Sequence, residues 1–459
     1  MKKVAIVGGG VSGLAIAYWL NDLGLTSDDL VVLESSATAG GNLQTEKVDG
    51  FTIEKGPNGF LDNSPATFTL VEKLGIDDQL LQSNENAARR FIYRAGKLRE
   101  IQTHPVKFIG SGVLPLSGAA RVALEPFQKK GGSETESVFD FAARRIGKDA
   151  AELLVAAMVQ GVFAGDARKL ELKSAFPKMY AMEQQYGSLF KAMIGKARAN
   201  KRAGKPSGGP AGPGGRLTSF VDGMQTLPTA LAEALGAMVQ PLRDVVRIQQ
   251  REHFILSCSD GTDIEAQSVV LANPAWSATR MIASFDTTLA AELKQIYYPA
   301  ITVVATGYRI AELDSVPQGF GFLVPRNQNV RALGCLWSSS VWNHRAPDDS
   351  ILLRTMVGGS VDEAASTLSD DEIVHVARTD LESTMGITAI PSLVKVYRHP
   401  RAIAQYECGH TARMKRVEKQ FLHHPGLFLS GSSYGGISVN HCIEEAPQVA
   451  KAVAAYLKI

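Results

Sequence analysis

Cysteine is scarce in this chain of 459 residues. The four cysteines are Cys258, Cys335, Cys408 and Cys442, and the two closest lie 34 positions apart. This spacing excludes a disulfide-stapled scaffold and the paired cysteines of a zinc knuckle or redox motif. We therefore expect free thiols and a cytoplasmic location.

A surplus of charge of one sign is also missing. The 48 basic and 46 acidic residues leave a formal net charge of +2, so no global charge recruits nucleic acid. Hydrophobic residues make up 45% of the chain and charged residues 20%, which excludes a disordered or collagenous protein. At roughly 150 residues per domain, the length predicts about three domain-sized units.

Long hydrophobic runs are absent as well. Two lysines followed by the apolar run 4–20 mimic a secretory signal, but four glycines interrupt the run and no small-x-small cleavage site follows. No other stretch reaches the ~20 apolar residues that span a bilayer. We expect a soluble protein that contacts, at most, the inner face of a membrane peripherally.

The sequence contains no recognisable group of catalytic or metal-binding side chains. The nine histidines, among them His399, His423 and His424, lack the spacing of metal ligands, and no Ser-His-Asp set is evident. The sequence therefore predicts no metal and no catalytic side chain.

Hydrophobic periodicity predicts a mixed α/β fold. Residues 4–7 resemble a buried strand, 12–20 a helix and 30–33 a second strand, which together form a Rossmann-like βαβ unit. The C-terminus returns to this pattern with a strand at 427–430 and a helix at 443–457. Further helices are predicted at 64–75, 224–235 and 370–385, and the pattern over 117–202 is mostly helical. Further extended segments are predicted at 86–99, 244–248, 254–257, 268–271, 301–308 and 351–356. The low-complexity segment 204–215 predicts a flexible loop.

Three glycines follow the first predicted strand. In Gly8-x-Gly10-x-x-Gly13, the first allows a tight turn, the second lets a pyrophosphate approach, and the third lets helix pack on strand. The helix N-terminus offers free N–H groups to phosphates. Glu34 ends the second strand, 21 residues beyond Gly13, where a carboxylate accepts hydrogen bonds from ribose. This combination predicts dinucleotide binding.

Two further segments distinguish flavin from nicotinamide. The pair Gly40-Gly41, followed by Asn42, resembles the extended FAD motif of the amine-oxidase-like flavoproteins. Gly431 closes the last predicted strand, and the segment 435–439 leads into a helix. This C-terminal return resembles the flavin-contacting end of the same superfamily. The resemblance implies that the cofactor is FAD.

Five longer blocks resemble a narrower family, the protoporphyrinogen oxidases. These blocks are 51–60 with Gly-Pro-Asn-Gly-Phe, 160–166 with Gly-Val-Phe-Ala-Gly-Asp, 319–325, 404–406, and 433–443. With the N-terminal motif they run in family order from residue 4 to residue 446. The chain departs from the family pattern at Gly59, Ala404 and His441.

The resemblance implies a set of residues that hold FAD, drawn from the glycine motifs, the strand ends and the C-terminal return. They are Gly8, Gly10, Val11, Ser12, Gly13, Glu34, Ser35, Gly41, Asn42, Gly56, Pro57, Asn58, Gly59, Val245, Gly431, Ile437, Ser438 and Val439.

The resemblance also implies substrate contacts. Arg90 occupies the place of an arginine that holds a substrate propionate, and a guanidinium suits a carboxylate because it binds both oxygens. Arg89 could exchange roles with it. Gly161 matches a glycine whose carbonyl faces pyrrole N–H groups. The positions implied to line an apolar slot are Phe320, Leu323, Leu336 and Met356.

The activity that the resemblance implies is oxygen-dependent, six-electron oxidation of protoporphyrinogen IX to protoporphyrin IX, with hydrogen peroxide as by-product, in haem biosynthesis. Coproporphyrinogen III is the alternative substrate, and the paired Arg89-Arg90 favours protoporphyrinogen. An amine oxidase or desaturase-like flavoenzyme, or a flavoprotein without catalysis, remains as a rival.

The implied architecture has a discontinuous FAD domain made from residues 1–86, 216–296 and 397–459. A helical insert at 87–215 contacts membranes in the family, and 297–396 forms a sheet-based substrate domain. The implied partners are a porphyrinogen and dioxygen. Peripheral membrane contact and a homodimer are left open.

Overall fold

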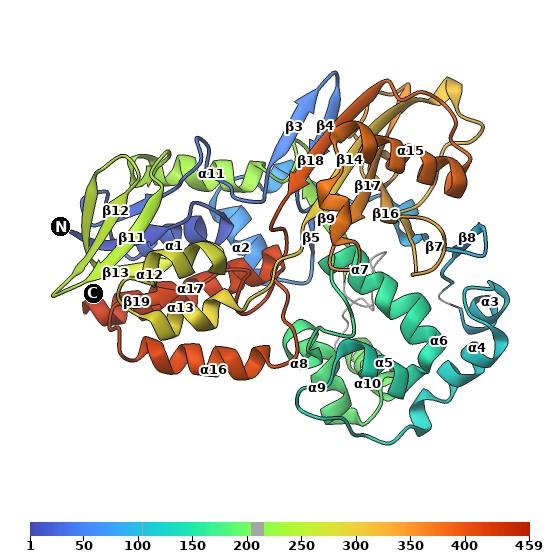
Figure 1. The fold of residues 1–459 in the computed structure, drawn as a ribbon, viewed down its shortest axis with the longest axis horizontal. Coiled ribbons are helices and arrows are strands. Elements are labelled where there is room, and N and C mark those ends of the chain that lie inside the picture. The colour runs from blue at the N-terminus through green and yellow to red at the C-terminus, as the bar shows by residue number, and fades with distance from the viewer. Residues whose placement is uncertain (103, 203–214) are drawn as a thin grey trace.

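The computed structural model describes residues 1–102, 104–202 and 215–459. Figure 1 shows three regions: one sheet with its helices on the left, a second sheet at the upper right, and a group of helices below it. Positions 204–214 of the low-complexity segment lie outside the described residues.

The first sheet has the N-terminal strand in its middle. β1 (Lys2–Val7) pairs in parallel with β2 (Leu30–Leu33) on one side and with β13 (Asp263–Leu271) on the other. The outer strands are β10 (Val239–Gln240) on β2, β19 (Leu427–Leu429) on β13, and the antiparallel strands β12 (Phe254–Cys258) and β11 (Val245–Gln250). The carboxyl ends of β1, β2, β13 and β19 therefore meet at one edge.

Helices cover both faces of this sheet because successive strand residues point to opposite sides. Val4 and Ile6 pack against the first helical layer, and Ala5 and Val7 against the second. The first layer contains α1 (Val11–Asp22), α11 (Thr226–Leu235) and α17 (Val439–Leu457), and the second contains α12 (Ala275–Ile282), α13 (Thr287–Lys294) and α16 (His410–Phe421). The predicted N-terminal βαβ unit is confirmed, as is the C-terminal return.

The second sheet combines strands from distant parts of the chain. Its order is β18 (Leu393–His399), β14 (Ile301–Arg309), β17 (Ser350–Gly358), β16 (Ala332–Trp337), β15 (Gly321–Leu323), β7 (Arg90–Arg94) and β8 (Lys97–Glu100). β7 pairs with β15 in parallel, and the other neighbours are antiparallel. The strands predicted at 301–308 and 351–356 are confirmed as β14 and β17.

The two faces of the second sheet differ. One face packs against α15 (Asp370–Met385) through Tyr308, Trp337 and Leu353. The opposite face is covered at one end by β3 (Thr45–Val48) and β4 (Phe51–Glu54), whose Phe51 and Ile53 pack on Ala305 and Leu352. At its other end it faces the helical region.

The helical region lies between β8 and β9 in the sequence, and it agrees with the mostly helical pattern predicted over 117–202. It contains α3 (Pro105–Gly110), α4 (Leu116–Ala123), α5 (Val138–Ile146), α6 (Lys148–Ala150), a π-helix (Ala151–Ala156), α7 (Ala157–Phe163), α8 (Leu172–Ala175), α9 (Pro177–Tyr186) and α10 (Leu189–Arg202). A fully buried ion pair between Arg145 and Glu125 ties α5 to the 3-10 turn after α4, and Glu125 also accepts the N–H groups of Leu189 and Phe190 at the start of α10. α7 packs against β15 and β16.

Short elements connect the regions: β5 (Phe60–Leu61), α2 (Pro65–Lys73), β6 (Leu80–Gln82), β9 (Leu217–Phe220) and α14 (Ser338–Val341). β5 and β6 both pair with β9. Among the described residues, every helix is too short or too polar to pass through a lipid bilayer.

Candidate active site

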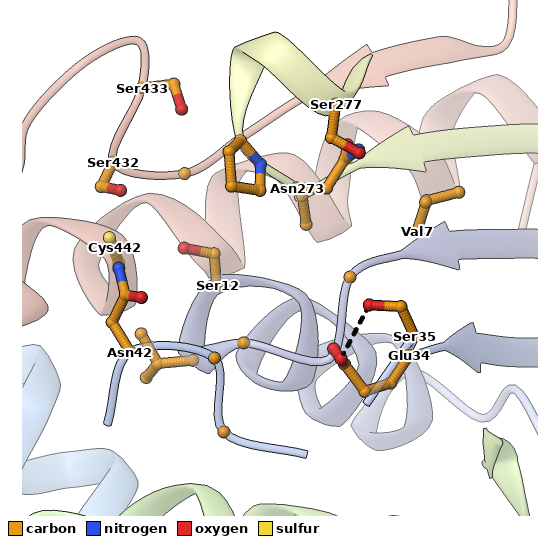
Figure 2. A pocket seen from close by; sticks show the side chains of 18 of the residues that line it. Val7, Ser12, Glu34, Ser35, Asn42, Asn273, Ser277, Ser432, Ser433 and Cys442 are labelled. Atoms are coloured by element: carbon orange, nitrogen blue, oxygen red, sulfur yellow. Dashed lines mark hydrogen bonds between the residues drawn. The ribbon is translucent and has the colours of Figure 1, made fainter. Parts of the chain in front are cut away.

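A cleft of about 310 Å³ opens where the carboxyl ends of β1 and β2 meet the C-terminal motif. Figure 2 shows Glu34 and Ser35 on one side of it, Asn42 and Cys442 on the other, and Asn273 and Ser277 above. Thirteen of the predicted cofactor residues line this cleft: Gly8, Gly10, Val11, Ser12, Glu34, Ser35, Gly41, Asn42, Pro57, Val245, Gly431, Ile437 and Val439. The structure thus brings most of that set together.

The backbone around the cleft leaves too little space for side chains at its glycine positions. A Cβ atom on Gly13 would lie 2.0 Å from the carbonyl oxygen of Gly8, so this glycine lets α1 pack against the turn. Gly8 has φ +108°, which side chains rarely adopt. Gly41 approaches Gly10 so closely that its Cβ would lie 3.1 Å from the Gly10 Cα. Side chains at these points would push apart the backbone segments that form the cleft.

The start of α1 is open to an anion. Gly10 precedes the helix without a capping side chain, and the first turn carries no acidic residue. Its N–H groups and the positive end of the helix dipole therefore face the cleft. This arrangement fits a pyrophosphate.

Glu34 is held rigidly at the edge of the cleft. Its Oε2 accepts the N–H of Gly9 at 2.8 Å and its Oε1 accepts the N–H of Ser36 at 2.7 Å, while the Ser35 hydroxyl lies 3.3 Å from Oε1 (Figure 2). A carboxylate has about four acceptor positions, so capacity remains for a ribose hydroxyl. The geometry agrees with the acid predicted at the end of the second strand.

Sequence reasoning missed the cleft wall contributed by β13 and α12. Asn273 and Trp276 line the cleft, and the Asn273 Oδ1 and Trp276 Nε1 atoms are buried without a hydrogen-bond partner among the described residues. Buried polar atoms of this kind suit a polar ligand. The available signal was their place just after the predicted strand 268–271, because ligands of such sheets bind beyond the carboxyl ends of strands.

The C-terminal motif divides into two roles. Ile437 and Val439 line the cleft, whereas Ser438 caps α17, since its hydroxyl accepts the N–H of His441 at 3.1 Å. Cys442, one turn into α17, also lines the cleft. Burial raises the pKa of its thiol to about 11, so the thiol is neutral at physiological pH.

The loop 55–59 lies against the segment around Asn42. A Cβ on Gly56 would lie 2.2 Å from the carbonyl oxygen of Asn42, and one on Gly59 would lie 2.5 Å from that of Thr218. Pro57 reaches the cleft, while Gly56, Asn58 and Gly59 do not line it. Arg354, which sequence reasoning missed, donates hydrogen bonds to the Asn58 side chain and the Gly56 carbonyl oxygen.

The second sheet gathers the predicted substrate residues. Arg90 pairs with Gly321, Gly321 with Leu336, and Leu336 with Arg354, so all four lie on one face. Leu323 and Met356 occupy the next row of the same face, where both pair with Gly334. This is the face opposite α15.

Gly161 and Phe320 complete the group. A Cβ on Gly161 would lie 2.3 Å from Leu323 Cδ2, so the end of α7 closely approaches this face of the sheet. The Arg90 guanidinium carbon lies 5.1 Å from the centre of the Phe320 ring. All six predicted substrate residues therefore lie at or beside one surface, with α7 opposite the strands.

The two neighbouring arginines have different environments. Arg89 forms an ion pair with Glu100 at 3.0 Å, whereas the guanidinium of Arg90 has no hydrogen-bonded partner among the described residues. Arg90 is half-buried, and burial lowers the pKa of its guanidinium. A desolvated cation without a counterion favours an anionic ligand.

Comparisons with known proteins agree with this geometry. The model of the family "Flavin containing amine oxidoreductase" matches residues 11–454. Coproporphyrinogen III oxidase of Bacillus subtilis is 30% identical, with 99% of this chain and 98% of that protein aligned. The chloroplastic protoporphyrinogen oxidase of Oryza sativa is also 30% identical, over 98% of this chain and 88% of its own length.

Solved structures share the fold. The crystal structure of a putative protoporphyrinogen oxidase from Exiguobacterium superposes with a TM-score of 0.84 at 25% identity, covering 100% of this chain and 99% of that one. Putrescine oxidase superposes with a TM-score of 0.70 at 17% identity, covering 99% of each chain, which shows the fold alone. The protein is thus an oxidoreductase that uses FAD, and the chain belongs to the family of flavin-containing amine oxidoreductases.

Proposed function

We propose that this protein oxidises protoporphyrinogen IX to protoporphyrin IX with dioxygen, in haem biosynthesis. The observation that carries the proposal is Arg90, a half-buried guanidinium without a counterion beside the apolar positions Phe320, Leu336 and Met356. A porphyrinogen matches this pairing because it combines a large apolar ring with propionate carboxylates. The names of the relatives from Bacillus subtilis and Oryza sativa support the same substrate class.

FAD would be held by the first sheet. Glu34 would accept hydrogen bonds from the ribose, and the start of α1 would bind the pyrophosphate. Asn273 and Trp276 would supply an acceptor and a donor from the opposite wall. When bound, FAD accepts hydride equivalents and passes the electrons to dioxygen.

The chain's own residues would bind and orient the substrate. Arg90 would pair with a propionate, and Leu323 and Met356 would exclude water from the ring. Gly161, which lies directly against the Leu323 side chain, would present its carbonyl oxygen to pyrrole N–H groups. The reaction balances as one protoporphyrinogen and three dioxygen molecules giving one protoporphyrin and three hydrogen peroxide molecules, a transfer of six electrons.

Coproporphyrinogen III is the second candidate, because the Bacillus subtilis relative is named for it and aligns over 99% of this chain. The ion pair of Arg89 with Glu100 bears on the choice. Because Glu100 already pairs with Arg89, Arg90 is the one of these two arginines that is available to a substrate carboxylate. A single cation suits protoporphyrinogen, which has two propionates on one side.

The test is a side-by-side assay of both porphyrinogens with the purified, FAD-loaded protein under air. We expect porphyrin fluorescence to appear, with a higher kcat/KM for protoporphyrinogen and one peroxide released per two electrons. An equal or higher kcat/KM for coproporphyrinogen would contradict the proposed preference for protoporphyrinogen. Peroxide formed with amines, and none with either porphyrinogen, would assign the protein to amine oxidation instead.

We also propose that the helical region contacts a membrane surface. Leu116 is 74% exposed, Leu124 50% and Phe127 80%, and Lys129 and Lys130 follow them on the surface. Exposed apolar residues beside lysines suit an anionic lipid interface. We expect the protein to sediment with anionic vesicles, and Phe127→Ser to weaken sedimentation. Leu422→Ser, at a residue 79% exposed on α16's C-terminal side, is the matched control.

A further inference from the structure

A cluster of buried charges lies behind the loop 55–59. Arg354 comes from β17, Glu54 from the end of β4, and Arg345 from the segment between α14 and β17. None of the three is more than 3% exposed. Two guanidiniums therefore share one carboxylate, which leaves the cluster with a surplus positive charge.

The remaining titratable groups around Arg354 do not offset this surplus. They are Cys335 on β16 and Tyr397 and His399 on β18. Burial raises the pKa of Cys335 to about 12 and raises that of Tyr397 as well, so both are neutral at pH 7. Burial lowers the pKa of His399, whose Nε2 lies 2.9 Å from the carbonyl oxygen of Lys55.

The two arginines are anchored to different parts of the structure. Arg345 donates to the carbonyl oxygens of Phe220 and Val221 at 2.9 Å, and lies 3.6 Å from Glu54. Arg354 instead donates to the loop: its Nη2 is 3.1 Å from the Gly56 carbonyl oxygen, and its Nη1 donates to Asn58. Arg354 is therefore the cation that touches the loop whose Pro57 lines the FAD cleft.

The contact with Arg354 determines how the Asn58 amide is oriented. A guanidinium has only donors, so the Asn58 atom facing it must be the carbonyl Oδ1. The NH₂ group of the same amide is then turned away from Arg354, and it has no hydrogen-bond partner among the described residues. Arg354 thereby leaves the two N–H donors of Asn58 without a partner among the described residues, directly beside Pro57, which lines the FAD cleft.

Keeping this charge buried is costly for folding. Burial lowers the pKa of Arg354 to about 10, so the side chain remains protonated at pH 7 in spite of the desolvation. A buried cation without its own anion stabilises any negative charge that develops nearby. FAD acquires such a charge when it takes up two electrons and only one proton.

We propose that Arg354 is a positioning residue for the flavin: it fixes the Asn58 amide with its N–H donors free, and its buried charge stabilises the reduced, negatively charged form of bound FAD. The proposal rests on FAD binding, which the family establishes, and is independent of the porphyrinogen substrate. Its failure therefore leaves the proposed function untouched, and failure of the porphyrinogen assays leaves this proposal untouched.

The first test is the midpoint potential of FAD bound to the wild-type protein, measured anaerobically with dithionite and a reference dye at several pH values. Each proton taken up by a two-electron couple contributes about 30 mV per pH unit. We expect a slope of about 30 mV per pH unit down to about pH 5.5, which corresponds to uptake of one proton. A slope of about 59 mV per pH unit across this range would overturn the proposal.

The second test compares variants in the FAD-loaded state. Arg354→Gln removes the charge, and we expect the equilibrium between oxidised and reduced FAD to shift at least tenfold toward the oxidised form, which is about 30 mV. Arg354→Lys keeps the charge but loses the hydrogen bond to Asn58. The midpoint potential of FAD should therefore stay near that of the wild type, while the flavin absorption spectrum changes.

Arg345→Lys is the matched control because it also keeps its charge and loses guanidinium hydrogen bonds, but none to the loop. We expect both its potential and its spectrum to match wild type. Equal spectral changes in the two lysine variants, or a wild-type potential in Arg354→Gln, would contradict the proposal. If Arg354→Gln does not fold, the wild-type slope and the two lysine variants still decide it.

Discussion

The cofactor cleft and the substrate face are built in opposite ways. The cleft is formed largely by backbone: close glycines, helix starts and strand ends, with the glycine turn and the ends of β1 and β2 inside the first 42 residues. The proposed substrate face is formed by side chains from β7, β15, β16 and β17, and its residues lie up to 266 positions apart. Cofactor binding therefore depends on local room for the backbone, whereas the proposed substrate selection depends on strand register.

The largest effect is expected from distorting the glycine turn between β1 and α1. Gly13→Val places a branched side chain where even a Cβ would lie 2.0 Å from the Gly8 carbonyl oxygen. Overpacking costs about 1–3 kcal/mol, so FAD affinity should fall by roughly tenfold to a hundredfold. The ratio of flavin to protein absorbance after gel filtration measures this. Full FAD occupancy in the variant would show that the close contact is not needed.

Removing FAD should affect the first sheet with its helices more than the second sheet. FAD at 100 times its Kd should add about 2.7 kcal/mol to the free energy of unfolding. Hydrogen exchange with and without FAD should show the added protection in α1 and at the start of α17, and little change in α15. Uniform protection over both sheets would mean that the regions are more strongly coupled than their construction implies.

On the substrate face, the charge of Arg90 should matter most. Arg90→Ala should raise KM for the porphyrinogen about tenfold or more, since hydrogen bonds to charged groups contribute about 1.5–3 kcal/mol, while FAD content stays constant. Arg89→Ala, which breaks the exposed ion pair with Glu100, is the control and should change KM little. Steady-state kinetics of both variants provide the measurement, and an equal loss of flavin in Arg90→Ala would refute the anchoring role.

The smallest effect is expected at the end of α7. In Gly161→Ala the new methyl group would meet Leu323 Cδ2, a flexible side-chain atom that can move. We therefore expect KM to rise less than tenfold with FAD binding unchanged, because the overlap costs about 1 kcal/mol. A loss of FAD from this variant would contradict the separation of the two surfaces.

The sequence allowed prediction of the parts in which neighbours along the chain are also neighbours in space. The glycine turn, Glu34 at the strand end, and the helix at 370–385 follow from local patterns, and the structure confirms these elements. Asn273 and Trp276 were missed because their role depends on β13 lying beside β1, which no local pattern encodes.

The substrate face could be predicted only through family resemblance. The parallel pairing of β7 with β15 joins Arg90 to Gly321 across more than 200 residues, and periodicity says nothing about such register. β15 and β16 are short or continuously apolar, and were not predicted as strands. Arg354 lies inside a predicted strand, where a single charged residue gives no sign that it reaches the loop at Asn58.

The packing of α1 against α17 has a consequence for synthesis of the protein. These helices come from opposite ends of the chain, and together with β19 they complete the cleft. On a ribosome that adds about 5–20 residues per second, the nucleotide site forms only after α17 has emerged. Cofactor binding therefore has to follow the synthesis of α17, and a chain stalled before α17 would emerge unable to retain FAD.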